Sequence, residues 1–122
     1  MRTLLMALFA AFCLATTTTS SIAADERDFT VVNRTGYTIR FIGVNAPGDN
    51  NFNENELNGL MAEGGTVDIK FGKGDKGCTW NMVIAWEGYN DAVIFKDMDL
   101  CKISKVTLRY DGATKVTSYV WE

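Results

Sequence analysis

The sequence predicts an all-β fold, specifically an antiparallel two-sheet β-sandwich of about seven strands with one disulfide. From Phe29 onward, apolar and polar side chains alternate with a period of two, which is typical of half-buried strands. Such segments recur at a spacing of roughly ten residues, separated by turn-forming residues. No intervening segment has the helical pattern that connects neighbouring strands of a parallel sheet, so an antiparallel arrangement is favoured.

The first strands are expected at 29–32 and 37–44, joined as a hairpin by the turn at 33–36. In the second of these strands, alternate residues from Tyr37 through Ile39 to Phe41 are expected on one face. The segment that follows contains the only proline and many Asx side chains, which favour an irregular loop.

Leu57, Leu60 and Met61 stand at helical spacing before two glycines, which predicts a single helical turn.

The remaining five strands are expected at 66–71, 80–87, 92–96, 103–110 and 115–121. The strand at 80–87, the fourth in order, has apolar residues on both faces and is therefore expected to be central in its sheet.

The N-terminus has the features of a bacterial secretory signal peptide. Arg2 supplies a positive charge, an apolar run extends from Leu4 to Ala15, and small residues lead up to Ala24. The apolar run is shorter than the roughly 20 residues needed to cross a bilayer. We therefore expect cleavage after Ala23 or Ala24. This assigns residues 1–24 to the signal peptide and leaves one β-sandwich domain at 25–122, periplasmic or secreted, with no membrane span.

Charge and composition exclude several functions. The formal net charge is −3, so the chain lacks the basic character of a protein that binds nucleic acid. It contains no histidine, which excludes histidine-dependent nucleophiles and bases and most zinc or copper sites. No recognisable catalytic set remains, so we do not expect an enzyme.

Cys13 leaves with the signal, so only Cys78 and Cys101 remain in the exported chain. An even number of cysteines in a small exported domain predicts a disulfide. The alternatives are a redox pair or a metal site, but the expected exported chain has neither Cys-x-x-Cys spacing nor further Cys or His ligands.

Two short motifs match known signatures without the context those signatures require. The stretch 72–77 reads Gly-x-Gly-x-x-Gly, but it leads into a strand rather than a phosphate-binding helix, which favours a mobile hairpin loop. Asn33-Arg34-Thr35 fits a glycosylation sequon, but the signal is bacterial in type and we interpret the motif as a turn.

The loop from Asn45 to Glu56 is the expected place for a ligand, because long loops on a rigid sandwich often carry function. Its side chains carry oxygen atoms of the type that calcium prefers as ligands. Their spacing matches no known calcium-binding motif. The alternative is a solvent-exposed loop that only connects two strands. The candidate ligand residues are Asp49, Asn51, Asn53, Glu54 and Glu56.

Aromatic residues supply a second candidate, a platform on which a sugar ring could stack. For Trp80 and Trp86, which alternate with Met82 and Ile84, packing in the core is the alternative interpretation. The candidate platform residues are Trp80, Trp86, Tyr89, Tyr110, Tyr119 and Trp121.

The segment 29–39, FTVVNRTGYTI, resembles the opening of small exported bacterial proteins of unknown function, which share a Phe-x-(hydrophobic)-x-Asn-x-Thr-Gly signature. The segments 64–71, 78–81 and 100–108 resemble later blocks of the same group, in the same order. The resemblance implies a β-sandwich with one disulfide and supplies no catalytic residue. Some members carry lyase names such as argininosuccinate lyase, an activity that needs a longer chain and histidine. The first strands also resemble the opening of thaumatin-like proteins, which are longer and rich in disulfides.

These observations together favour an exported, non-catalytic binding or interaction module with an unidentified protein or glycan partner. A surface domain that binds calcium or carbohydrate is the alternative. A small hydrolase or lyase is the third possibility, and it would require a pair of close carboxylates or an activated Ser, Lys or Tyr.

Overall fold

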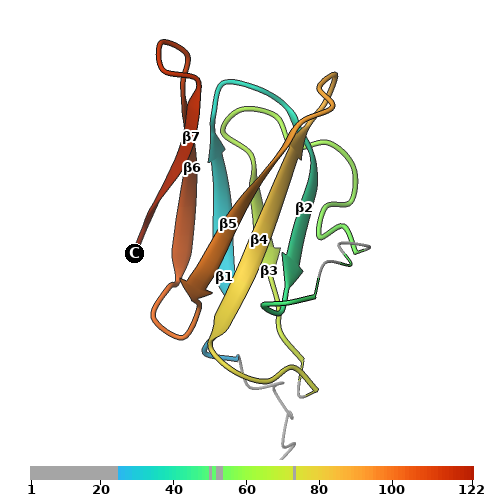
Figure 1. The fold of residues 1–122 in the computed structure, drawn as a ribbon, viewed down its shortest axis with the longest axis vertical. Helices are drawn as coiled ribbons and strands as arrows, with labels where there is room; N and C mark the ends of the chain where they lie inside the picture. Colours follow the sequence, from blue (N-terminus) through green and yellow to red (C-terminus); the bar gives the residue numbers. More distant parts are fainter. Residues whose placement is uncertain (1–24, 50, 52–53, 73) are drawn as a thin grey trace, which may run out of the picture.

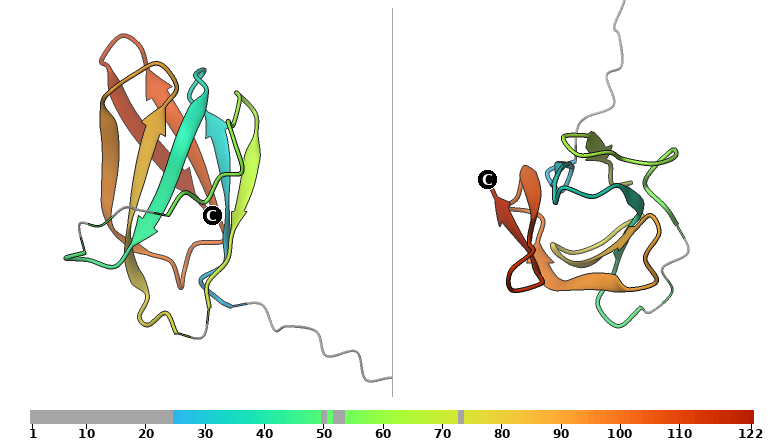
Figure 2. Two further views of the ribbon diagram at one scale, coloured as in Figure 1. Left: turned by 90° about the vertical axis from the view of Figure 1, so that its right-hand side faces the viewer. Right: turned by 90° about the horizontal axis from the view of Figure 1, so that it is seen from above.

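The computed structural model describes residues 25–49, 51, 54–72 and 74–122, so the predicted signal peptide at 1–24 lies outside the described residues. The described residues form seven strands and no helix. Two sheets face each other, one with the order β3-β1-β6-β7 and the other with the order β2-β4-β5 (Figure 1; Figure 2). The predicted all-β sandwich with about seven strands is confirmed. The strands are β1 (Phe29–Arg34), β2 (Ile39–Asn45), β3 (Thr66–Ile69), β4 (Thr79–Trp86), β5 (Ala92–Asp99), β6 (Lys105–Asp111) and β7 (Val116–Trp121).

One strand pair departs from the antiparallel expectation. All pairs in the three-stranded sheet are antiparallel, but β1 and β6 are parallel in the other sheet, with Val31 beside Val106. A parallel pair needs a long crossover between its strands. Here β2 to β5 lie between them along the chain, and three of these four strands belong to the opposite sheet.

The expected hairpin of the first two strands is wrong. β1 and β2 lie in different sheets, so the segment between them passes from one sheet to the other. The glycine-rich loop at 72–77 likewise connects β3 to β4 across the sandwich and is not a hairpin loop. Turn-forming residues indicate where a chain changes direction, but they do not determine which sheet receives the next strand.

The expected face of the second strand is also wrong. The register of β2 against β4 shifts between Ile39 and Phe41, so alternation is interrupted there. Ile39 and Ile42 are fully buried, whereas Tyr37 lies before the strand and is 45% exposed. The side chain of Tyr37 is thereby free to line the end of the sandwich.

The single helical turn expected around 57–61 is absent from the described residues, and this segment covers the outer edge of β2 instead. Met61 forms an antiparallel bridge with Ile39. The Glu56 amide donates to the Ile42 carbonyl at 2.8 Å, and the Asn55 Oδ1 atom accepts from the Ile42 amide at 3.1 Å. Backbone groups along β2 are thus satisfied where an open edge would invite pairing with another chain.

The core is built from the inward faces of both sheets. β4 is the middle strand of its sheet, as predicted, and residues on both of its faces are buried. The largest fully buried side chains of the core are Val31, Ile39, Ile42, Ile69, Met82, Ile84, Met98, Leu100, Val106 and Leu108.

No helix in the described part of the chain is long and apolar enough to cross a membrane.

One end of the core is closed by an arginine. The Arg27 guanidinium lies 4.9 Å from the centre of the Phe71 ring and 6.0 Å from that of Trp80, and Arg27 is only 8% exposed. Asp25 accepts hydrogen bonds from Arg27 at 2.9 and 2.8 Å, which holds the guanidinium in place. A cation over the ring faces is a favourable arrangement, and it seals this end.

The predicted disulfide is present at the same end of the sandwich. Cys78 precedes β4 and Cys101 follows β5, with their Cα atoms 5.2 Å apart. The bond therefore joins the connection before the central strand of one sheet to the connection leading into β6 of the other.

Replacing both cysteines in Cys78→Ala/Cys101→Ala should lower the free energy of unfolding by about 2–5 kcal/mol, because the loop in the unfolded chain is released. Chemical denaturation measures this loss. A reducing agent should bring the parent protein to the stability of the variant and leave the variant unchanged. Equal stability of the parent and the variant in the absence of a reducing agent would contradict a structural role.

Asp25 should contribute to stability in a pH-dependent way. Hydrogen bonds from Arg27 lower the pKa of Asp25 from about 3.8 to about 2 in the folded protein. A carboxyl group with a lowered pKa stabilises the fold above its unfolded value and loses this contribution as the pH falls through the folded value. Asp25→Asn should therefore be less stable than the parent at pH 5 and above, and the difference should shrink between about pH 4 and pH 2. Thermal unfolding against pH checks this, and a difference that persists below pH 2 would contradict it.

Candidate functional site

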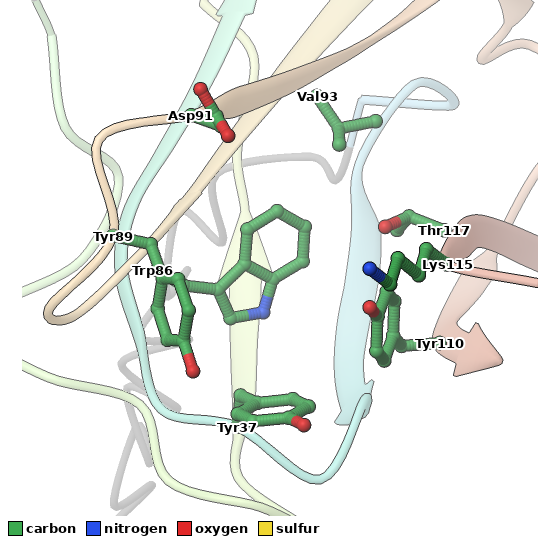
Figure 3. A pocket seen from close by; sticks show the side chains of 8 residues that line it. All are labelled: Tyr37, Trp86, Tyr89, Asp91, Val93, Tyr110, Lys115 and Thr117. Carbon is green, nitrogen blue, oxygen red and sulfur yellow. The ribbon is translucent and has the colours of Figure 1, made fainter. Parts of the chain in front are cut away.

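The candidate site is a pocket at the end of the sandwich opposite the disulfide. Three connections meet at this end, namely those between β1 and β2, β4 and β5, and β6 and β7 (Figure 1). The pocket has a volume of about 300 Å³. It is lined by Tyr37, Trp86, Tyr89, Asp91, Val93, Tyr110, Lys115 and Thr117 (Figure 3).

Two of the lining aromatic residues end the inward-facing rows of the core. Trp86 is the last residue of β4 and follows the buried Ile84 at a period of two. Tyr110 follows the buried Leu108 in β6 in the same way. Both are half-buried, so the core ends in aromatic rings that the connecting loops leave partly open.

The four aromatic rings surround the pocket on several sides. Tyr37 and Tyr89 have ring centres 5.9 Å apart with planes at 82°, and Tyr37 and Tyr110 have centres 5.5 Å apart with planes at 81°. Figure 3 shows Tyr37 at the base, Tyr89 and Tyr110 on opposite sides, and Trp86 behind them. The rings therefore form a box rather than a flat platform.

Charged groups lie at the rim of this box. Asp91 and Lys115 both line the pocket and are exposed. Figure 3 shows the Lys115 ammonium extending toward the space between the rings, and Asp91 across that space, above the Trp86 indole. Neither residue forms an ion pair within the described part of the chain. A ligand would meet one group of each sign.

A fully buried asparagine fixes the loop that carries Tyr37. The Asn33 amide nitrogen donates to the Tyr37 carbonyl at 2.8 Å and to the Met61 carbonyl at 3.1 Å. The Asn33 Oδ1 atom accepts from the Thr35 amide at 3.1 Å and from the Thr35 hydroxyl at 2.7 Å. Thr35 in turn accepts a hydrogen bond from the Trp86 indole at 3.2 Å. The side chain of Asn33 thus positions two walls of the pocket, and as the first residue of the apparent sequon it is inaccessible in the fold.

Gly36 is required in this loop for a conformational reason. Its φ is +82°, a left-handed conformation that side chains disfavour. Its amide donates to the Glu63 carboxylate at 2.7 Å, which ties the loop to the segment preceding β3.

The predicted ligand loop is not part of the pocket. β2 runs toward the opposite end of the sandwich, so the loop that follows it begins there (Figure 2). Asp49 accepts a hydrogen bond from the Asn51 amide at 2.9 Å, a local turn contact. Asn53 lies outside the described residues, and Glu54 is exposed.

Glu56, the last residue of that loop, is half-buried. Burial and the negative charges of Glu54 and Asp75 raise the pKa of its carboxyl group. The Glu56 amide donates to the Ile42 carbonyl at the edge of β2, so this part of the loop stabilises the sheet edge.

The described carboxylates of the loop form no group close enough to hold a metal ion. The one cluster of ligand atoms within the described ranges consists of Asp99 with Cys78 and Cys101. Both sulfur atoms are joined in the disulfide and cannot act as thiolate ligands. This cluster is therefore no metal site.

Three of the six candidate platform residues do come together, namely Trp86, Tyr89 and Tyr110. Trp80 is buried at the closed end, Tyr119 packs against Phe95 with ring centres 4.7 Å apart, and Trp121 is 54% exposed away from the pocket. The sequence reasoning missed Tyr37, Asp91, Lys115 and Thr117. Tyr37 was expected on a strand face, and Asp91 and Lys115 lie in turns, where the sequence gives no direction for the side chain. Thr117 lies in β7 on the same half-buried face as Tyr119, but as a small polar residue it gave no signal of a site.

A second hollow, of about 440 Å³, lies between the segment covering β2 and β3. It is lined by residues 56–62 and 65–68, which include no aromatic side chain. The aromatic pocket is therefore the better candidate for a ligand.

Comparison with protein-family models, with curated proteins and with solved structures gives no match to this chain. The candidate site therefore depends on its own geometry.

Asn33→Ala should lower the free energy of unfolding by about 2–4 kcal/mol. It leaves the buried Thr35 amide without a partner and removes one hydrogen bond from each of the Tyr37 and Met61 carbonyls. Asn58→Ala is the matched control, since Asn58 is exposed, and it should change stability by less than about 0.5 kcal/mol. Chemical denaturation measures both. Similar losses in the two variants would contradict the proposed role of Asn33.

Proposed function

We propose that the protein is an exported, non-catalytic binding module that holds a small ligand, or part of a larger one, in the aromatic pocket. The observation that supports this most directly is the box of four aromatic rings at one end of the sandwich. Aromatic residues at an open concave site favour ligand binding, because their large faces gain from being covered.

The pocket volume of about 300 Å³ is at the lower end of the range typical of small-molecule sites. The exposed fractions of Tyr37 and Tyr89 are 45% and 57%. A ligand between these rings would remove apolar surface from water, which is the main source of affinity in such sites. The rings are held in place before binding, because the loop carrying Tyr37 is fixed through Asn33. Preorganisation of this kind reduces the entropic cost of binding.

Export is proposed on two grounds. The first 24 residues have the pattern of a signal peptide, and a periplasmic or secreted location would follow from it. The disulfide suits such a location, because disulfides persist in oxidising compartments.

The non-catalytic character is proposed from the chemistry of the lining residues. Asp91 is the one carboxylate among the described residues that line the pocket, and Lys115 is the one amine. Hydrolysis of glycosides normally needs two carboxylates. The chain contains no histidine that could serve as a base.

Carbohydrate is the second ligand class that the pocket supports. Three tyrosine hydroxyls and the Thr117 hydroxyl lie among its lining groups and could bond to sugar hydroxyls. Carbohydrate binding in this pocket would not involve the loop at 45–56 that the sequence favoured as the ligand site.

Screening a glycan array and a panel of small metabolites by thermal shift tests the proposal. At least one ligand should raise the melting temperature of the parent protein. The shift should be lost in Tyr89→Ala/Tyr110→Ala and kept in Trp121→Ala, which removes an exposed aromatic ring outside the pocket. A ligand that stabilises all three proteins equally would place binding elsewhere, and the absence of any ligand would contradict the proposed function.

A further inference from the structure

We propose that the aromatic pocket binds a quaternary ammonium group that is covalently linked to an anion, as in a phosphocholine or a betaine. This inference rests on the proposed function and specifies the ligand class of the same site. It follows from the ring geometry, from a comparison of the two ends of the sandwich, and from the charges at the rim.

The ring geometry suits a rounded cation. The planes of Tyr89 and Tyr110 are both nearly perpendicular to that of Tyr37, and Trp86 lies behind them (Figure 3). Ring faces carry the negative part of the aromatic quadrupole, so several rings around one space attract a cation. A trimethylammonium group presents methyl groups in every direction and can contact several walls together. A sugar ring has two flat faces and stacks best on a flat platform.

At the opposite end of the sandwich, the protein covers two aromatic rings with one of its own cationic side chains. There the Arg27 guanidinium lies over Phe71 and Trp80, and the Asp25 carboxylate balances its charge. Within the described ranges, Arg27 supplies every cation placed over an aromatic ring. Among the described residues no cationic group lies over the four rings of the pocket, although the Lys115 ammonium extends toward the space between them. An external cation would complete at the open end the arrangement that Arg27 provides at the closed end.

Asp91 and Lys115 determine what else the ligand must carry. Asp91 lies at the rim and favours a cation in the box by charge. Lys115 extends toward the same space and would repel a ligand that carries positive charge alone (Figure 3). An anion attached to the ammonium group could pair with Lys115, which has no partner within the described residues. A zwitterionic ligand therefore satisfies both rim charges.

Isothermal titration calorimetry with defined probes tests the inference. The probes are phosphocholine and glycine betaine as zwitterions, choline as the cation alone, and 3,3-dimethylbutyl phosphate as the neutral-headed isostere of phosphocholine. Phosphocholine or glycine betaine should bind about tenfold more tightly than 3,3-dimethylbutyl phosphate, because only the former place a cation among the rings. Choline should bind more weakly than the zwitterions.

Three variants separate the contributions of the pocket. Tyr89→Leu and Tyr110→Leu should each weaken binding of the zwitterions several-fold, since leucine keeps an apolar wall but lacks the quadrupole. Trp121→Leu is the matched control and should bind as the parent does. Lys115→Met should weaken phosphocholine and glycine betaine but leave choline unchanged or bound more tightly, a split that a purely structural effect would not produce.

The outcomes distinguish this inference from the proposed function. If a saccharide binds in the pocket and no ammonium probe binds at concentrations up to roughly 10 mM, the inference is overturned and the proposed function stands. Equal affinity for phosphocholine and its neutral isostere would also overturn the inference. If phosphocholine alone binds, a phosphate-bearing source such as a lipid headgroup is indicated, whereas binding of glycine betaine alone indicates a free carboxylate solute.

Discussion

The arrangement of the open end depends on the buried side chain of Asn33. Its amide and carbonyl groups make four hydrogen bonds at the point where the chain leaves one sheet for the other. A fully buried amide is costly unless all of its hydrogen-bonding groups have partners, so these bonds specify one conformation of the loop. That conformation sets the position of Tyr37, and through Thr35 it holds the indole of Trp86. The walls of the pocket are therefore linked to one buried polar group.

The two ends of the sandwich differ in how the core is closed. At the end with the disulfide, Arg27 covers Phe71 and Trp80 and is neutralised by Asp25. At the other end, Trp86 and Tyr110 are the last inward-facing side chains of β4 and β6, and no cationic side chain lies over their rings among the described residues. A small sandwich has little buried surface to spare, so leaving aromatic rings open has a cost in stability. We interpret that cost as the reason to expect a ligand there.

Much of the fold was predictable because strand periodicity is a local property. Alternation identified all seven strands, and the apolar character of both faces placed β4 in the centre of its sheet. The assignment of strands to sheets was not predictable, because the residues of the turn at 33–36 are as compatible with a crossing between sheets as with a hairpin. The parallel pairing of β1 and β6 depends on that same crossing.

The candidate site was predictable only in part. Trp86 and Tyr110 stand in strands whose periodicity gives their direction, and they were among the candidate platform residues. The position of Tyr37 depends on the crossing between the two sheets and on the hydrogen bond from Asn33, neither of which the alternation of the sequence reveals. Lys115 has a φ of +56° in the turn between β6 and β7, and the direction of its side chain follows from that local geometry. The Asx-rich loop attracted attention by composition, although its described residues serve mainly to form turns and to cover the edge of β2.

Nuclear magnetic resonance chemical-shift mapping during titration with phosphocholine tests the central claim most directly, because it locates the ligand on the molecule. We predict that the shifted resonances are the Trp86 indole N–H and the backbone amides of the three connections at 35–38, 87–91 and 112–115. Amides near Arg27 and Cys78, at the closed end, should remain unchanged. Shifts concentrated between Asn45 and Glu56, or no shift at any concentration, would contradict the account.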